Sequence, residues 1–424
     1  MKCINCGNKK LRKIVSMGSQ PLSGIFYKKK NYNLRKYPLD LYRCNKCTLV
    51  QLRKTAKKIE MFGKTYEYRT SLSNLMITHI KNKIKYLKSN NFLKKRSNIL
   101  DIGSNDGTFL NYFDKSNNLI GVDPSADKFK KFYKKNIHVC SDFFSKKILN
   151  NFNKQKKISI NQFDIITSFA MFYDVDDPNS FCKDIESSLT DNGVWMLELS
   201  YLPLMLKNLT YDQICHEHIG YYTLTSFKKI AEKNKMKIID IGFNEINGGS
   251  IEIVCSKINS KFIAKSKKIQ KVLIDEKKIK ISSYKNFNTR INEVKKKLQT
   301  FIQGNSKKKI LGYGASTKGN IVLSHCKINN KQIRYVGDGS IRKKGRYTPG
   351  TNIKIISKKM MRVMKPNYLL VLIWSFRKEV IKQELDFLLK GGELVFHLPR
   401  FHIINIRNYK YFLKNDFKKL AYKY

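Results

Sequence analysis

The segment LDIGSNDGTF, residues 100–109, decides the fold class of this chain. An apolar run ends at Asp101 and enters a turn that contains Gly103 and Gly107, and the residues up to Phe113 resemble a helix. Glycine permits positive φ and lets a ligand approach the backbone closely. The segment therefore predicts a strand, a ligand-binding turn and a helix.

Similar apolar strands follow at regular intervals. LIGVDPS (119–125), FDIITSFAMFYDV (163–175) and GVWMLELSYL (193–202) alternate with helical segments. This alternation predicts an α/β fold with a doubly wound, Rossmann-like parallel sheet. The segment 201–256 predicts a helix, a strand, a turn and a strand that complete the same sheet.

The rest of the chain divides around this sheet. We expect a small unit at 1–60, the sheet domain at 61–258, a lysine-rich helical linker at 259–306 and a smaller Rossmann-like α/β domain at 307–424. The apolar positions of 72–87 recur at helical spacing, which predicts a helix entering the sheet domain. The last domain opens with KKKILGYGASTKGN, again a strand, a glycine-rich turn and a helix.

Cysteines define the first unit. Cys3, Cys6, Cys44 and Cys47 form two C-x-x-C pairs, a spacing that brings four thiolates to one Zn²⁺. Four protein ligands leave no position for a reacting water, so we expect the zinc to be structural.

The formal charge of +52 suggests a nucleic-acid partner. However, lysine is spread over nearly every polar segment, and no nucleic-acid-binding motif accompanies it, so we consider nucleic acid an unlikely partner. No run of about eighteen apolar residues is present, so we expect no membrane partner. The N-terminus lacks the apolar core of a signal peptide, and we expect a cytoplasmic protein.

The turn at 101–107 favours a cation. Asp101 and Asp123 end two successive strands, and an acid at the second position can accept hydrogen bonds from both ribose hydroxyls. The pattern G-x-G-x-x-G of pyrophosphate-binding turns is not matched. The cofactor S-adenosylmethionine (SAM), with a sulfonium and an ammonium, fits better. The predicted cofactor-binding residues are Asp101, Gly103, Asn105, Asp106, Gly107 and Asp123.

The segment ICHEHIGYY, residues 214–222, carries a second candidate site. Two histidines flank a glutamate, but the i, i+4 spacing of helical metal sites is absent, so a metal is disfavoured. A cluster of general bases remains, and so does a buried, hydrogen-bonded histidine with no chemical role.

In this order the motifs resemble one family. The two C-x-x-C pairs, LDIGSNDGTF, GVDPS, ICHEHIGYY, INGGS and GYGASTKGN…GRYTPGT are similar to the C-methyltransferases of nucleotide-linked keto sugars, such as dTDP-sugar C-3-methyltransferase. The resemblance covers nearly the whole chain. It implies a zinc domain, a class I SAM-dependent methyltransferase domain and a C-terminal Rossmann-like domain that helps to hold the nucleotide sugar.

The resemblance also implies residue roles. The catalytic base falls on His218, with Glu217 and His216 before it. A family tyrosine falls on Tyr66 or Tyr68, which the sequence alone does not separate. The tyrosine that opens the family's run is Cys215 here, and a thiol is a poorer partner for a sugar oxygen than a tyrosine hydroxyl. Tyr221 or Tyr222 is the candidate to compensate.

Two glycine turns are candidates for binding the substrate. Asn247 and Gly248 lie in a turn that either faces the site or is an ordinary hairpin. The turn at 312–320 suits a phosphate at a helix N-terminus. Alone it suggests a cofactor such as NAD, whereas the resemblance favours the substrate's diphosphate. The candidate contacts there are Gly314, Ser316, Lys318, Asn320, Arg346 and Tyr347.

These observations predict a SAM-dependent C-methyltransferase that removes a proton next to a sugar ketone and methylates the enolate carbon. The alternatives are an O- or N-methyltransferase of a related small molecule and a zinc-containing nucleic-acid-binding protein.

Overall fold

The computed structural model describes residues 1–53, 56–57, 60–61, 68–415 and 420–422. A seven-stranded sheet forms the core of one lobe of the molecule, in the order β10-β11-β8-β7-β4-β5-β6. The strands from β8 to β6 are parallel, whereas β11 runs antiparallel to both β8 and β10. The strands are β4 (Asn98–Ile102), β5 (Asn118–Val122), β6 (Ile137–Cys140), β7 (Phe163–Phe169), β8 (Leu189–Ser200), β10 (Met236–Asn244) and β11 (Ser250–Lys257).

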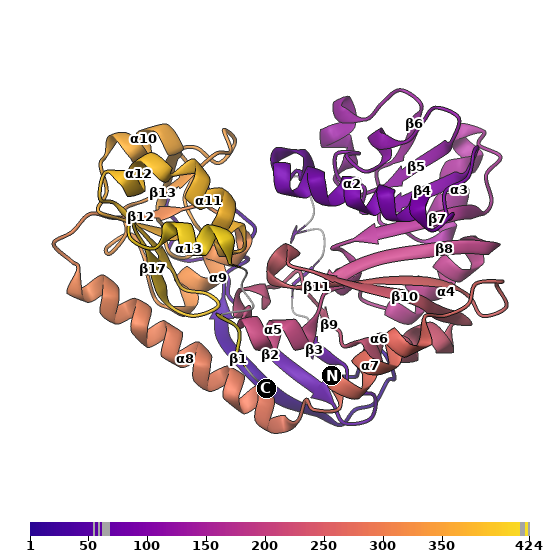
Figure 1. Cartoon of the computed structure of the whole chain (residues 1–424), viewed down its shortest axis with the longest axis horizontal. Coiled ribbons are helices and arrows are strands. Elements are labelled where there is room, and N and C mark those ends of the chain that lie inside the picture. Colours follow the sequence, from indigo (N-terminus) through magenta and orange to yellow (C-terminus); the bar gives the residue numbers. More distant parts are fainter. Residues whose placement is uncertain (54–55, 58–59, 62–67, 416–419, 423–424) are drawn as a thin grey trace.

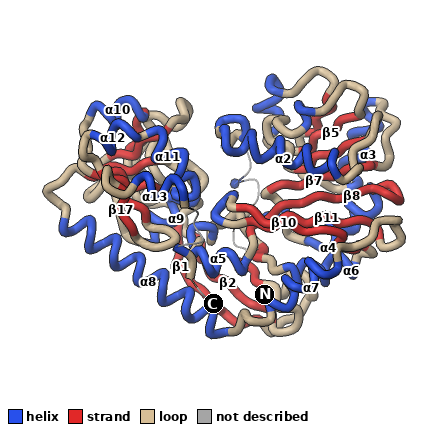
Figure 2. Tube along the Cα trace, in the orientation of Figure 1, coloured by secondary structure: helices blue, strands red, loops and turns tan. Residues whose placement is uncertain are grey.

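Helices cover both faces of this sheet because successive side chains of a strand point to opposite faces. Ile99 and Leu100 of β4 illustrate this alternation, since they pack into two separate apolar clusters. The cluster around Ile99 includes α2 (Asn74–Ser89). The cluster around Leu100 includes α3 (Lys146–Lys156), α4 (Pro178–Ser188) and α6 (Leu224–Lys233). The predicted doubly wound α/β fold is confirmed (Figure 2).

A second parallel sheet forms the C-terminal domain, in the order β14-β13-β12-β15-β16-β17, with only β17 antiparallel. Its strands are β12 (Ile310–Tyr313), β13 (Tyr335–Asp338), β14 (Lys354–Ser357), β15 (Tyr368–Val371), β16 (Glu393–Phe396) and β17 (His402–Ile404). Its helices are α9 (Thr317–His325), α10 (Lys358–Val363), α11 (Arg377–Gln383), α12 (Leu385–Leu389) and α13 (Tyr409–Lys414).

The N-terminal unit contributes a third sheet, in the order β1-β2-β3-β9. Three strands come from this unit: β1 (Leu11–Gln20), β2 (Tyr37–Cys44) and β3 (Val50–Leu52). The fourth, β9 (Gly220–Tyr221), belongs to the segment 214–222 and pairs with β3. The short helix α5 (Leu202–Asn208) precedes that segment. The N-terminal sheet therefore anchors the histidine motif.

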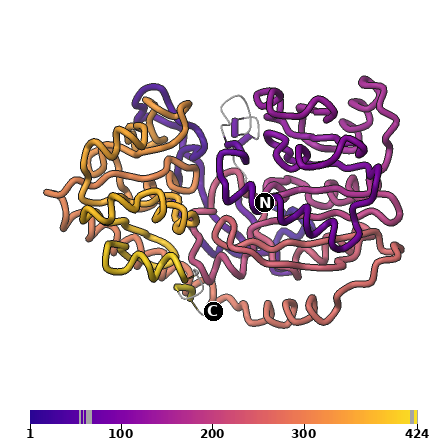
Figure 3. Tube along the Cα trace, turned by 45° about the horizontal axis from the view of Figure 1, so that its top comes forward, coloured from indigo at the N-terminus to yellow at the C-terminus, as the bar shows by residue number. Residues whose placement is uncertain are grey.

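The three units form two lobes joined below by the N-terminal sheet (Figure 1). The linker folds into α7 (Ser266–Glu276) and α8 (Ile281–Gly304), and α8 runs along the base of the C-terminal lobe. The indigo N-terminal segment also lies against the orange C-terminal domain in Figure 3, where Tyr27 and Tyr347 pair through their backbones. None of the helices in the described ranges has the length and apolarity needed to span a bilayer.

One local prediction is wrong, and a second, the helix at 72–87, is confirmed except at its start. The helix expected after Gly107 is a single 3-10 turn, Leu110–Tyr112, because the chain leaves the turn to pack Leu110 and Phe113 into the core. In the helix at 72–87, Ile80, Ile84 and Leu87 are buried, whereas Leu72 precedes α2 and is exposed. The apolar stripe therefore packs against the sheet only from the second turn of α2 onward.

Candidate functional site

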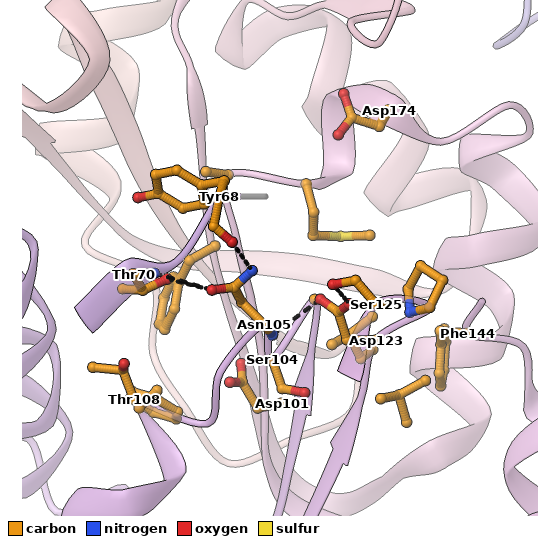
Figure 4. A pocket seen from close by; sticks show the side chains of 18 of the residues that line it. Tyr68, Thr70, Asp101, Ser104, Asn105, Thr108, Asp123, Ser125, Phe144 and Asp174 are labelled. Carbon is orange, nitrogen blue, oxygen red and sulfur yellow. Dashed lines mark hydrogen bonds between the residues drawn. The ribbon is translucent and has the colours of Figure 1, made fainter. Parts of the chain in front are cut away.

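A cavity of about 220 Å³ lies where the parallel strands β4, β5 and β7 end (Figure 4). Carboxyl ends of neighbouring parallel strands meet at one edge of a sheet, which is the usual ligand-binding edge of this architecture. The glycine turn after β4 forms its floor. Gly103, at φ 77°, lines the cavity, and a Cβ atom there would come within 3.0 Å of the Met171 side chain.

Two acids face this cavity from the ends of β4 and β5. Asp101 accepts a hydrogen bond of 2.7 Å from the Thr167 hydroxyl, and burial nevertheless raises its pKa to about 7. Asp123 accepts hydrogen bonds from the backbone N–H groups of Asn105 and Ser125, at 3.0 and 2.7 Å. Burial raises the pKa of Asp123, and these bonds oppose the shift. The arrangement presents buried carboxyl groups to a ligand.

The charge of the cavity is opposite to that of the chain. The formal charge of the chain is +52, yet no lysine or arginine lines the cavity among the described residues. The acids that line it are Asp101, Asp123, Asp142, Asp174 and Glu198. Such a wall repels a pyrophosphate and attracts a cation.

Two of the predicted cofactor residues serve the turn itself and do not line the cavity. Asp106 is 1% exposed and accepts hydrogen bonds from the hydroxyl and backbone N–H of Ser71 and from Arg69. A Cβ atom at Gly107 would lie 2.6 Å from the Tyr133 ring. Both residues therefore shape the turn and hold the segment before α2 against it.

Tyr68 lines the cavity beside this segment and lies opposite the two acids in Figure 4. Its carbonyl accepts a hydrogen bond of 3.0 Å from the Asn105 side chain, and the residue is 49% exposed. The other tyrosine candidate, Tyr66, lies outside the described residues.

The segment 214–222 runs beside the cavity. The Ile219 N–H donates to the Tyr173 carbonyl at 2.8 Å, and the rings of His218 and Tyr173 lie 4.2 Å apart. Met171 and Asp174, next to Tyr173 in the chain, line the cavity. His218 is partly exposed and does not itself line the cavity; Tyr173, on which its ring packs, links it to the two lining residues.

His218 carries no proton at neutral pH. Burial and the neighbouring Lys318 cation lower its pKa to about 3, while a hydrogen bond with the Gln213 backbone acts the other way. Burial also lowers the pKa of Lys318, and the Asp212 carboxylate opposes that shift. His218 is thus a neutral imidazole that can accept a proton.

The other members of the motif differ in exposure. His216 is 4% exposed, and its Nε2 lies 3.3 Å from the Tyr37 carbonyl in the N-terminal unit. Tyr222 is fully buried, with its ring centre 5.2 Å from that of Phe172 in the sheet core. His216 thus contacts the N-terminal unit and Tyr222 packs in the sheet core, and neither side chain lines the cavity.

Glu217 lies against Gly24 of the N-terminal unit, close to Thr317 of the C-terminal domain. Its Oε1 lies 2.8 Å from where a Cβ atom at Gly24 would be, and the Thr317 hydroxyl lies 3.6 Å from the same point. Burial raises the pKa of its carboxyl, and the Cys215 thiol beside it opposes the shift. Cys215 is itself 1% exposed.

The turn of the C-terminal domain meets the motif through Lys318. Its ammonium donates a hydrogen bond of 3.0 Å to the Asn247 side chain, and Asn247 also accepts from Gln213 through its carbonyl. Gly248 fits tightly here, since a Cβ atom would lie 2.7 Å from the Trp374 ring. The turn at 246–249 therefore joins the two lobes next to His218.

The remaining candidates in the C-terminal domain have partners of their own. The Ser316 hydroxyl caps α9 by accepting from Gly319, and the Ile373 side chain covers Gly314. Asn320 donates to the Ser23 carbonyl at 2.8 Å. Arg346 donates to the Phe26 carbonyl, and Tyr347 pairs with Tyr27. The Asn320 and Arg346 side chains and the Tyr347 backbone thus contact the N-terminal unit, whereas Lys318 lies close enough to His218 to lower its pKa.

The four paired cysteines converge. Their sulfur atoms all lie within 4.8 Å of one another, with 3.4 Å between Cys3 and Cys47 and 3.6 Å between Cys6 and Cys44. A tetrahedral zinc with bonds of about 2.3 Å needs sulfur atoms about 3.8 Å apart, so this group fits Zn²⁺. The set is complete with four thiolates, which favours a structural ion.

Three comparisons relate these units to known proteins. Residues 3–62 match the family model described as "Putative zinc binding domain", residues 74–240 match "Methyltransferase domain", and residues 245–399 match "C-methyltransferase C-terminal domain". The C-methyltransferase NovU of Streptomyces niveus is 25% identical over 412 residues, which cover 95% of this chain and 97% of NovU. The chain belongs to the C-methyltransferases with an N-terminal zinc-binding domain.

Solved structures resemble parts of this C-methyltransferase only weakly. The plantazolicin methyltransferase BpumL is 13% identical, with a TM-score of 0.33, over 43% of this chain and 83% of BpumL. A SAM-dependent methyltransferase of Leishmania major is 12% identical, with a TM-score of 0.33, over 42% of this chain and 71% of its own. At such scores the likeness adds nothing to the family assignment.

The family assignment establishes two cofactors. The C-methyltransferase is a SAM-dependent enzyme with a class I methyltransferase domain, and its N-terminal domain binds structural zinc. The acid-lined cavity fits the first cofactor because SAM carries a sulfonium and an ammonium. Asp123 stands where the ribose hydroxyls of such a ligand are held in this architecture.

Sequence reasoning missed a buried ionic cluster at one end of the cavity. Glu198 of β8 and His79 of α2 line the cavity, and Lys83 bonds to both Glu198 and Glu252. His79, Glu198 and Glu252 lie close enough to hold a metal, but the Lys83 ammonium already bridges the two carboxylates. The single charged residue in the apolar run VWMLELS was the available signal.

Proposed function

We propose that this C-methyltransferase acts on a keto sugar linked to a nucleoside diphosphate, and that His218 removes the proton next to the ketone. One observation carries the proposal: a neutral imidazole packs on Tyr173, whose chain neighbours Met171 and Asp174 line the acid-walled cavity, and the Lys318 cation of the C-terminal domain is close enough to lower its pKa. A base needs an unprotonated nitrogen within reach of its substrate, and His218 meets the first condition at neutral pH.

The two sides of His218 suit the two ends of such a reaction. The cavity takes the cationic cofactor, which supplies an electrophilic methyl group when bound. Lys318 offers an ammonium to the anionic diphosphate of the substrate. A sugar held between them lies at His218, and its C–H proton passes to the imidazole while the electron pair moves toward the ketone oxygen.

Substrate binding also strengthens the base. Lys318 helps to lower the pKa of His218 in the free protein. A diphosphate paired with Lys318 neutralises that cation and raises the pKa of His218 back toward its ordinary range. We infer that the histidine becomes a better base when the nucleotide sugar is in place, which limits wasteful deprotonation of other ligands.

Hydrogen exchange tests the proposal without the methyl transfer. The enzyme is incubated in D₂O with nucleoside-diphosphate keto sugars, and the sugar protons are followed by NMR. We expect deuterium at one carbon beside the ketone, and we expect His218→Asn to slow this exchange at least about 100-fold. His216→Asn is the matched variant, for which we expect a smaller loss because His216 faces Tyr37.

Three outcomes contradict the proposal. Exchange that continues in His218→Asn assigns the base to another residue. Methyl transfer to a sugar oxygen or nitrogen, without exchange at carbon, favours an O- or N-methyltransferase. Salt-sensitive oligonucleotide binding without SAM binding favours a nucleic-acid-binding protein.

A further inference from the structure

Glu198 is the most firmly held acid in the wall of the cavity. It sits near the end of β8 and is 2% exposed. One of its carboxylate oxygens, Oε2, lies 2.8 Å from His79 Nε2, 2.5 Å from Lys83 Nζ and 2.8 Å from the Asn244 amide nitrogen. These elements, α2, β8 and β10, are all part of the methyltransferase domain.

The Glu198 carboxylate is ionised at neutral pH. Burial favours the protonated acid, but the contacts with His79 and Lys83 outweigh it and hold the pKa at about 2. By contrast, the pKa of Asp101 in the same cavity is about 7, so that acid is only partly ionised. Glu198 therefore supplies a fixed negative charge.

Glu198 is one of five acids that line the cavity, and no lysine or arginine of the described residues lines it. Lys83, shared between Glu198 and Glu252, and His79 hold the Glu198 carboxylate in this wall. Lys83 is 2% exposed, and charges in so buried a place interact strongly. A cation that enters the cavity beside Glu198 is consequently favoured over a neutral molecule of the same shape.

We propose that Glu198 makes the cavity prefer the sulfonium cofactor over its neutral thioether product. The proposal rests on the assignment of this cavity to SAM. Loss of the methyl group converts the sulfonium of SAM into the uncharged thioether of S-adenosylhomocysteine (SAH) and leaves the rest of the molecule unchanged. Attraction to Glu198 is weaker after transfer, so the product leaves and competes poorly with fresh cofactor.

Calorimetric titration of the full chain with SAM and with SAH tests this role. The measured quantity is the ratio of the SAH to the SAM dissociation constant. We expect Glu198→Gln to reduce that ratio about tenfold, since one charge interaction of a buried group is lost. Glu252→Gln is the matched control: Glu252 bonds to the same Lys83 and Asn244 but does not line the cavity. Its ratio stays within about twofold of the wild type.

Several results overturn the proposal. One is an equal affinity of the wild type for SAM and SAH, which needs no variant at all. Another is an unchanged ratio in Glu198→Gln, or an equal fall in Glu252→Gln. The role of His218 does not enter these measurements. If SAM fails to bind this cavity, Asp123→Asn leaves its affinity intact, and that result identifies the cofactor assignment as the error.

A second inference follows from the join between the zinc turn and the histidine motif. Gln51 of β3 is 2% exposed, and its backbone pairs with Gly220 of β9. Its side chain accepts a hydrogen bond from the Ile4 N–H at 2.9 Å and donates one to the Lys2 carbonyl at 3.1 Å. Those two residues flank the zinc ligand Cys3.

We propose that Gln51 is a positioning residue that fixes the 214–222 segment to the zinc-bound turn. The Gln51 side chain holds the zinc-bound turn, and the Gln51 backbone pairs with β9. Zinc binding therefore keeps β3 and β9 in register. The effect on catalysis rests on the proposed role of His218, whereas the effect on the segment does not.

Hydrogen–deuterium exchange of the zinc-loaded protein tests this coupling. We expect Gln51→Leu to speed amide exchange in 216–222 about tenfold while the zinc content and the SAM affinity stay unchanged. Asn179→Ala is the matched control, because Asn179 holds the same turn at the Asn5 carbonyl but is not joined to β9. If Gln51→Leu fails to fold, chelation of zinc from the wild type gives the same readout. Unchanged protection of 216–222 in either experiment overturns the proposal.

Discussion

The turn after β4 and the turn after β12 follow buried parallel strands at corresponding places in two sheets, yet they differ in what they offer a ligand. The first is open, and Asp101 and Asp123 face a cavity above it. The second is filled: the Asp338 carboxylate accepts the Ala315 N–H at 2.8 Å, and Ile373 covers the glycine. From this turn, Lys318 is the side chain that approaches the 214–222 segment.

Because of this difference, the two lobes present opposite charges toward the candidate site. The methyltransferase side is anionic although the chain is basic, and the C-terminal side presents Lys318. A glycine-rich turn thus does not by itself define a nucleotide site. The charged side chains that reach the ligand decide which kind of ligand each turn binds.

The largest expected effect is on the SAM affinity, when the acid that accompanies each turn is replaced by its amide. We expect Asp123→Asn to weaken SAM binding about 100-fold, because two hydrogen bonds to a charged group are lost. Asp338→Asn, the corresponding acid after β13, leaves the SAM affinity unchanged. Calorimetry measures both, and the thermal midpoint of each variant reports on folding. Equal losses in the two variants contradict the division of roles.

A smaller effect is expected at the cation of the second turn. Lys318→Met removes a charged donor and weakens binding of the nucleotide-sugar substrate about tenfold, while the SAM affinity is retained. Loss of the cation also raises the pKa of His218, which NMR titration of the imidazole detects as a shift of its midpoint to higher pH. A lowered or unmoved midpoint is incompatible with the arrangement described.

The sequence predicted the sheets better than the contacts. Segments rich in apolar residues, such as 163–169, identify strands because a strand that is buried on both faces needs mostly apolar side chains. The motif LDIGSNDG located the cavity, but it could not show that Asp106 bonds to Ser71 while Asp101 faces the ligand. Alternate residues at a turn can point into a cavity or away from it.

Long-range contacts explain the other differences. Asn320 looked like a phosphate contact, but its amide bonds to Ser23, which lies 297 residues earlier. Glu198 was missed because its partners Lys83 and His79 lie on α2, more than a hundred residues earlier in the chain. Local patterns carry no information about such partners, because these depend on how distant elements pack.

The smallest effect concerns the pH dependence of the first turn. The pKa of Asp101 is about 7 in the free protein, so its carboxyl is mostly protonated at pH 6 and mostly ionised at pH 8. The ionised form attracts a cation, and bound SAM in turn lowers this pKa and releases a proton. Affinity for SAM therefore rises with pH, by up to about tenfold between pH 6 and 8 if only the ionised form binds.

Asp101→Asn supplies the control for this effect, because it removes the titrating carboxyl and leaves the ligand's own amino group to titrate. The difference between the wild-type and variant curves isolates Asp101. The C-terminal sheet has no ionising group at the equivalent position, since Gly312 is the next-to-last residue of β12 as Asp101 is of β4. A wild-type affinity that is flat, or that falls relative to the variant as the pH rises, removes Asp101 from the cofactor site and leaves Asp123 and Glu198 as its charged walls.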